Sequence, residues 1–178
     1  MLSGVCVRLS RDPVRRGFIV FCAGLAVTVV TTLAGYPVAF GILQLLGCCM
    51  LLYGAAKPRI ERRNGSARFA AACMLLFTGT WALTAAIRVD ITFLYPLGLR
   101  SAGFSSADYF PLLPWAFLFL SGTCLGKFLD ARRDTPLLRR RYAPALTFCG
   151  RHSLAVYLLH QPVIYGVLFM IFSQDRNL

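Results

Sequence analysis

The fold is decided by a stretch of 20 residues without a formally charged side chain, GFIVFCAGLAVTVVTTLAGY, which runs from Gly17 to Tyr36. As an α-helix, this stretch is long enough to cross a hydrocarbon core of roughly 30 Å. A soluble protein of this size instead scatters its apolar residues at helical or strand period. Four further runs of this kind follow, at residues 38–56, 69–87, 109–126 and 153–172. The sequence therefore predicts an all-α, polytopic membrane bundle, with one transmembrane domain of five helices over residues 1–178.

Composition indicates the same class of protein. The chain has 178 residues, of which 57% are hydrophobic and 15% charged, and its mean hydropathy is +0.64. These values exclude disorder and disfavour a soluble domain. The seven cysteines lie mostly inside the apolar runs, where cysteine behaves as a small apolar residue. With two histidines and no clustered carboxylates, we expect no metal site.

The charged side chains predict a topology. Of the 19 Lys and Arg, 16 fall in the N-terminal segment and in the second and fourth connections between runs. The opposite side holds only Arg88, Arg100 and Arg176, balanced by three aspartates. By the positive-inside rule, the N-terminus is cytoplasmic and the C-terminus extracytoplasmic. Because the arginines flank spans and form no basic domain with interleaved aromatics, we expect membrane lipids as partners and no nucleic acid.

Short connections and glycines predict how the helices pack. The turn at residues 35–37 is so short that the first two helices must be antiparallel neighbours. The glycines that allow close helix approach are Gly41, Gly47 and Gly54 in the second run and Gly122-x-x-x-Gly126 in the fourth.

The long connection before the fourth run lies on the extracytoplasmic side. In it, Ser105 or Ser106 is expected to cap the helix that follows, with Pro111 and Pro114 in the first turns of that helix. Asp108 then lies near the start of the helix, where the helix dipole favours a carboxylate.

The last run carries a polar stripe. Ser153, Tyr157, His160 and Gln161 recur at i, i+4, i+7 and i+8, so a helix places them on one face, and Pro162 follows directly. An ionisable residue inside a membrane is a functional hypothesis by default. A neutral His160 that makes a hydrogen bond between helices, for example to Gln44, is an equally weighted structural interpretation.

Three segments resemble a known family. They are GILQLLG at 41–47, SADYFPLLPW at 106–115 and GRHSLAVYLLHQP at 150–162. In order and spacing, the chain resembles bacterial membrane proteins related to the catalytic domain of heparan-alpha-glucosaminide N-acetyltransferase. The resemblance implies an acyltransferase of the bacterial cytoplasmic (inner) membrane, which passes an acetyl group from cytoplasmic acetyl-CoA to an amine or hydroxyl of a glycan on the far side. It also implies a chain shortened at its N-terminus, because Met1 corresponds to a point inside the domain.

The resemblance also implies roles for individual residues. His160 and Asp108 become the catalytic candidates: the histidine as a general base or acyl carrier, the aspartate as a ligand of the acceptor amine. A surrounding polar network would bind substrate, and arginines near the cytoplasmic side would bind the phosphates of CoA. The network residues are Gln44, Ser153, Tyr157 and Gln161, and the arginines are Arg139, Arg140, Arg141 and Arg151.

Two other functions compete with the enzyme. The first is a non-catalytic or truncated membrane component that packs with partner helices, or with copies of itself, through its glycine faces. The second is a small-solute transporter, in which the break at His160, Gln161 and Pro162 lines the path.

Overall fold

The computed structural model describes residues 1–8, 10–33, 35, 38–63, 66–86, 92–99, 106, 108–131 and 152–160. The chain divides into two compact units, Met1–Arg133 and Asp134–Leu178, and each is described by itself. Within the described ranges the regular structure is entirely helical, which confirms the predicted all-α fold.

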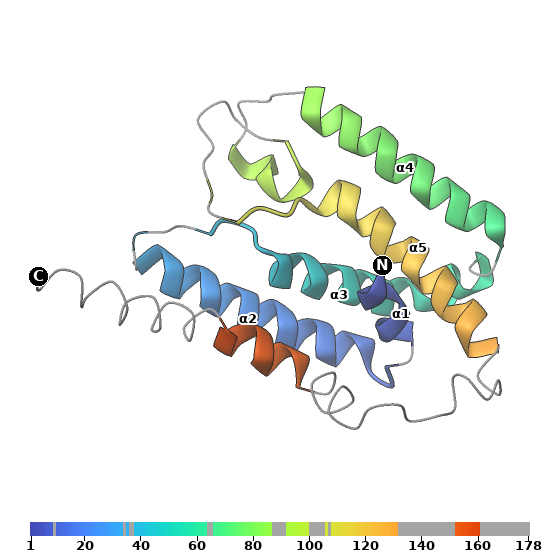
Figure 1. Ribbon diagram of the computed structural model, residues 1–178, viewed down its shortest axis with the longest axis horizontal. Helices are drawn as coiled ribbons and strands as arrows, with labels where there is room; N and C mark the ends of the chain where they lie inside the picture. The colour runs from blue at the N-terminus through green and yellow to red at the C-terminus, as the bar shows by residue number, and fades with distance from the viewer. Residues whose placement is uncertain are drawn as a thin grey trace, which may run out of the picture. The chain divides into compact units, whose positions relative to one another are not determined.

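The described residues of the first unit form five α-helices and one 3-10 helix. Its elements are α1 (Leu2–Arg8), α2 (Pro13–Leu33), α3 (Ile42–Arg63), α4 (Ala67–Ala86), η1 (Thr92–Leu97) and α5 (Leu112–Ala131). The main helix pairs are α2 with α3 and α4 with α5, while α1 packs on α5 and α3 also contacts α5 (Figure 1). Each main pair runs antiparallel (Figure 1), as the short turn at residues 35–37 predicts for α2 and α3.

Three helices of the described part are long and apolar enough to cross a membrane. They are α2, α4 and α5, which correspond to the first, third and fourth predicted spans. The helix in the second predicted span, α3, begins at Ile42 and continues through Lys57 to Arg63. Its uncharged part, Ile42 to Ala56, rises only about 22 Å. Of the fifth span, residues 153–160 are helical and the remainder lies outside the described residues, so the count of five stays a prediction.

Helix starts follow from local capping chemistry. Asp12 precedes α2, and Pro13 occupies its first position, where the missing N–H costs nothing. Ser66 caps α4, because its hydroxyl oxygen accepts a hydrogen bond from the Arg68 N–H at 3.2 Å. These caps explain why α2 and α4 begin a few residues before the charge-free runs.

Glycines bring α2 and α3 close together. Gly17 and Gly24 on α2 face α3, and Gly47 and Gly54 on α3 face α2, each pair seven residues apart. A Cβ at Gly47 would lie 2.7 Å from the backbone of Phe21, nearer than real Cβ atoms come. The predicted close approach through Gly47 and Gly54 is confirmed.

A second glycine contact joins α1 to α5. A Cβ at Gly122 would collide with the Met1 carbonyl oxygen, and one at Gly4 with the Phe119 carbonyl oxygen. At Gly126 the Cβ would lie 3.2 Å from the Val5 Cα. The Gly122-x-x-x-Gly126 face is therefore used for helix packing, as the sequence predicts, and its partner is α1.

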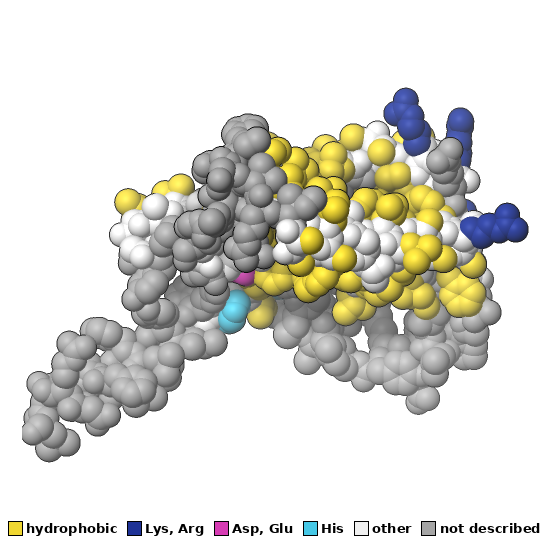
Figure 2. All heavy atoms as spheres, turned by 90° about the horizontal axis from the view of Figure 1, so that it is seen from above, with side chains coloured by type: hydrophobic (Ala, Val, Ile, Leu, Met, Phe, Trp, Pro, Cys, Tyr) yellow, Lys and Arg dark blue, Asp and Glu magenta, His cyan; other side chains and the backbone are white. Residues whose placement is uncertain are grey.

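Basic side chains gather at one end of the first unit. The starts of α2 and α4 and the ends of α3 and α5 share this end, which is on the right in Figure 1. Lys and Arg side chains project from it in Figure 2, whereas hydrophobic side chains cover much of the helix surface beyond it. We call it the basic end, and the opposite end, where α3 and α5 begin, the mouth. The described basic residues follow the predicted grouping, and the three arginines predicted for the opposite side, Arg88, Arg100 and Arg176, lie outside the described residues.

Candidate functional site

Gln44 lies buried at the start of α3, with 4% of its surface exposed. Its Oε1 accepts a hydrogen bond from the Gly41 N–H at 2.7 Å, and its Nε2 donates to the Thr28 hydroxyl of α2 at 2.9 Å. The first bond is the returning half of a capping box, in which the third helical residue satisfies the N–H of the cap. Gln44 therefore closes the start of α3 and ties it to α2.

The predicted partner of Gln44 was His160, and the described partners are Gly41 and Thr28. Gly24 of α2 makes this arrangement possible, because a Cβ there would lie 2.8 Å from the Gln44 Cγ. The sequence does carry a signal for the cap: a glycine followed three residues later by a glutamine at the start of an apolar run.

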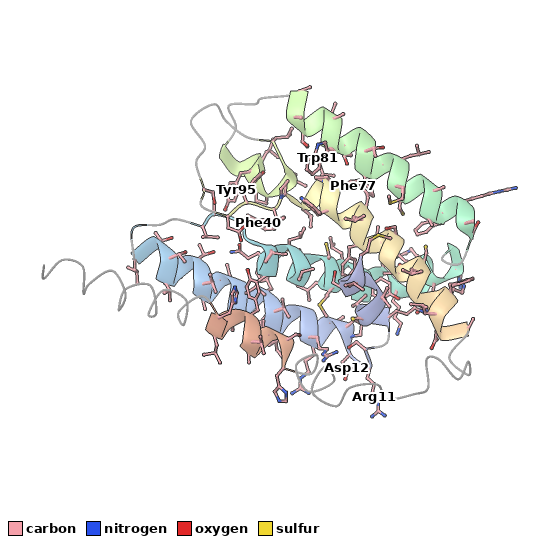
Figure 3. The ribbon with its side chains drawn as sticks, viewed as in Figure 1. Arg11, Asp12, Phe40, Phe77, Trp81 and Tyr95 are labelled. Carbon is pink, nitrogen blue, oxygen red and sulfur yellow. The ribbon has the colours of Figure 1, made fainter. Side chains whose placement is uncertain are left out.

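At the mouth, the segment before α5 is fixed to the segment before α3. Phe40 and Tyr109 form an isolated parallel β-bridge, in which the Phe110 N–H donates to the Phe40 carbonyl oxygen at 3.0 Å. The Tyr109 hydroxyl donates to the Tyr95 carbonyl oxygen of η1. Phe40 and Tyr95 are labelled in Figure 3, at the end where these segments meet. Residues 38–41 were predicted to be helical, but they precede α3, and Phe40 among them takes part in this pairing.

Ser106 belongs to the same hydrogen-bond network. Its hydroxyl oxygen accepts from the Ala39 N–H at 3.1 Å, and the hydroxyl donates to the Asp108 carbonyl oxygen at 2.7 Å. Because α5 begins at Leu112, six residues later, the prediction that Ser106 caps this helix is wrong. Ser105, the other predicted cap, lies outside the described residues.

Asp108 is half buried beside the start of α3. A Cβ at Gly41 would lie 3.3 Å from its Oδ2, so Asp108 and Gln44 meet at the same glycine. The positive end of the α3 dipole favours a carboxylate there. No described residue donates a hydrogen bond to this carboxylate, which leaves it able to accept one from a bound amine or hydroxyl.

The second unit contains the predicted stripe. Ser153, Tyr157 and His160 lie in the helical residues 153–160, as their spacing predicts. The rings of Tyr157 and His160 are 5.1 Å apart between centroids, and the His160 Nδ1 contacts the Tyr157 carbonyl oxygen. A carbonyl oxygen only accepts, so a hydrogen bond at this contact requires the tautomer with the proton on Nδ1, in which the lone pair of a neutral His160 is on Nε2.

The remaining predicted site residues lie outside the described part of the chain. They are Gln161 of the stripe and the arginines Arg139, Arg140, Arg141 and Arg151. Within the described part, no group of three or more metal-ligating side chains forms, and the absence of a metal stays a prediction.

Two features of the first unit were not predicted from sequence. One is a cavity of about 370 Å³ at the mouth, between α4, Gly98 after η1 and the start of α5. The other is an ion pair between α1 and α3 at the basic end, where the Arg8 Nη1 lies 4.0 Å from the Glu61 Oε1. The Tyr53 hydroxyl donates to the same carboxylate at 3.5 Å. Both features bring together residues that are far apart in the sequence, so local sequence patterns do not predict them.

Comparison with protein families gives a match over most of the chain. The family described as heparan-alpha-glucosaminide N-acetyltransferase, catalytic, matches residues 1–162. This range includes Gln44, Asp108 and His160. Comparison with curated proteins gave no match, and comparison with solved structures gave none either.

Proposed function

The chain belongs to the heparan-alpha-glucosaminide N-acetyltransferase catalytic family, and from this premise we propose that it moves an acetyl group from cytoplasmic acetyl-CoA to an amine or hydroxyl of an extracytoplasmic glycan. The family match gives an acetyltransferase-like membrane protein in general. The single observation that carries the finer proposal is that the match spans both the Asp108 mouth and His160. Acceptance of a glycan and the sidedness of donor and acceptor are the proposed part.

The donor would enter at the basic end. Its phosphates are anionic, and this end gathers the described Lys and Arg side chains of the first unit (Figure 2). Arg139, Arg140, Arg141 and Arg151 are proposed to bind these phosphates, because guanidinium groups match phosphate oxygens in pairs. The positive-inside rule supports a cytoplasmic location for this end.

The acceptor would bind at the mouth. The Asp108 carboxylate lies there without a hydrogen bond from any described residue, which suits a role in holding an amine. Gln44, Ser153, Tyr157 and Gln161 are proposed to complete the polar surroundings of the reacting groups. Gln44 would act by fixing the Gly41 turn beside Asp108.

His160 is proposed to take part in the proton and acyl transfer. With Nδ1 held by the Tyr157 carbonyl, Nε2 can remove a proton from the acceptor nitrogen or oxygen as this atom attacks the thioester carbonyl. The new bond to the acetyl carbon forms, the carbon–sulfur bond breaks, and the CoA thiolate takes the proton. A covalent variant, in which Nε2 first carries the acetyl group, uses the same free nitrogen.

The test is acetyl transfer by the purified chain in proteoliposomes, with labelled acetyl-CoA outside and an amino sugar inside. His160→Ala should abolish transfer, and Asp108→Asn should raise the KM for the acceptor. His152→Ala is the matched control, since His152 precedes the stripe, and it should retain activity.

Three outcomes would contradict the enzyme. Equal loss in the His152 and His160 variants would indicate a structural role for both. Folded, monodisperse protein that does not bind acetyl-CoA would favour a non-catalytic component. Sugar uptake without acetyl-CoA would favour a transporter.

A further inference from the structure

The cavity at the mouth has an aromatic lining. Its walls include Trp81 and Thr84 of α4, Gly98 after η1, Tyr109 and Phe110 before α5, and Trp115 in the first turn of α5. At about 370 Å³ it falls in the range of small-ligand sites. Phe77 and Trp81 lie on the side of α4 that faces α5 (Figure 3).

Packing holds the aromatic walls in place. The Trp115 ring lies edge-on to Phe110, Phe77 and Trp81, with centroid distances of 5.5, 5.8 and 5.9 Å. Trp81 is 52% exposed, so the protein leaves about half of this lining residue uncovered. Such a preformed wall can bind a ligand without losing further side-chain entropy.

Gly98 keeps the backbone close to the cavity. It has a φ of +110°, which favours glycine, and a Cβ there would lie 3.0 Å from the Thr84 Cγ2 and 3.1 Å from the Pro111 Cβ. A side chain at this position would therefore crowd the wall formed by Thr84.

The side chains that line the cavity indicate which kind of ligand it binds. The described lining residues are uncharged, and they combine aromatic rings with two hydroxyl groups. Aromatic faces bind the C–H groups of a ring, and the hydroxyls of Thr84 and Tyr109 supply polar contacts at the edge. The Thr84 hydroxyl already donates to the Thr80 carbonyl oxygen at 2.9 Å, so its oxygen remains able to accept. An aliphatic lipid chain would need no such hydroxyls.

We propose that this cavity is the binding site for a sugar ring of the acceptor, with the ring stacked on the indole of Trp81. The assignment rests on the proposed function for the identity of the acceptor as a glycan. Asp108 immediately precedes Tyr109 and Phe110 in the chain, so a ring in the cavity would lie near the carboxylate proposed to hold its amine.

The chain provides its own probe of this site. It contains two tryptophans, and both line the cavity, so all tryptophan emission reports on it. The full chain in nanodiscs, without acetyl-CoA, is titrated with methyl glucosaminide. A saturable change in emission is expected. Glucitol, an open-chain polyol without a ring face, should give no saturable change.

Variants test the assigned contacts. Trp81→Ala should weaken methyl glucosaminide binding roughly tenfold, read from the emission of Trp115. Thr84→Val keeps the shape, removes the hydroxyl and should weaken binding about threefold to tenfold. Phe18→Ala is the matched control, because Phe18 is a 61% exposed aromatic on α2 that does not line the cavity, and it should leave affinity unchanged.

Three results would overturn the assignment. The first is a tryptophan emission that methyl glucosaminide leaves unchanged, or changes only as glucitol does, in folded protein. The second is an unchanged affinity for methyl glucosaminide in both Trp81→Ala and Thr84→Val. The third is quenching of the emission by brominated lipid chains that the sugar does not relieve. The last would mean that a lipid chain fills the cavity. Sugar binding without acetyl transfer would support the sugar site in the cavity and contradict the proposed acetyltransferase activity. Acetyl transfer with an acceptor KM that Trp81→Ala leaves unchanged would refute the sugar site in the cavity and leave the proposed acetyltransferase activity intact.

Discussion

The mouth and the basic end of the first unit use buried polar groups in opposite ways. At the mouth, the Gln44 amide bonds to Gly41 and Thr28, and the Ser106 hydroxyl bonds to Ala39 and Asp108. At the basic end, Arg8 has a 16% exposed side chain, and its Nε and Nη1 are buried without a hydrogen bond. Its Glu61 partner is at 4.0 Å.

This difference separates a rigid end from an adaptable one. A satisfied buried network specifies one geometry, whereas a buried donor without a partner costs stability and favours rearrangement. The proposed acceptor site thus lies on backbone that is cross-linked between α2, α3 and the segment before α5. The end proposed to admit the donor is held by a looser ion pair.

The largest effect is expected from Gln44→Leu. The apolar side chain fills similar space but leaves the Gly41 N–H and the Thr28 hydroxyl without their partner, which should lower the free energy of unfolding by about 3 kcal/mol. Denaturation in mixed micelles measures it. Thr28→Val, which removes only one of the two bonds, should cost about 1 kcal/mol. Equal costs would mean that the cap on Gly41 adds nothing.

A steric comparison between the two ends should give the next largest effect. A Cβ at Gly24, near the mouth, would lie 2.9 Å from the Gln44 backbone nitrogen, which cannot move without shifting α3. At Gly54, near the basic end, the Cβ would first meet the Cγ2 of the Val14 side chain. Gly24→Ala should therefore cost about 2 kcal/mol and Gly54→Ala about 1 kcal/mol. A larger cost at Gly54, in the same unfolding assay, would contradict the assignment of the rigid end.

The sequence predicted the helices better than it predicted their ends. A hydrocarbon core demands long charge-free helices, so α2, α4 and α5 were found from apolar runs alone. The start of α3 was missed by four residues, because the Phe40 backbone pairs with the segment at Tyr109, far along the chain. Such pairing leaves no local pattern in a run that reads as continuous apolar sequence.

The candidate site was predicted only in part. Asp108 and Gln44 were chosen as site candidates because of the family resemblance, and the structure brings them together at Gly41. Their arrangement depends on Gly24, whose close approach to α3 was not predicted. The aromatic cavity was missed because its walls come from three elements that meet only after folding.

Substitutions in the Arg8 and Glu61 pair should have smaller effects. Glu61→Gln removes the carboxylate nearest the poorly satisfied guanidinium and should cost about 1 kcal/mol. Arg8→Met keeps the length of the side chain, removes the buried donors and should be neutral within about 0.5 kcal/mol. A large loss for Arg8→Met would show that Arg8 holds the basic end as firmly as Gln44 holds the mouth.

A stabilising effect is expected only at Gly79, a glycine that belongs to neither end. It lies on α4, and a Cβ there would meet no atom within 4 Å. Alanine is the better helix former, so Gly79→Ala should raise the free energy of unfolding by up to about 1 kcal/mol in the same micelle assay. Gly47→Ala is its matched opposite, since a Cβ there meets the Phe21 backbone at 2.7 Å, and it should be destabilising. Destabilisation by Gly79→Ala would instead mean that a further helix, from a second copy or a partner, packs on this face of α4.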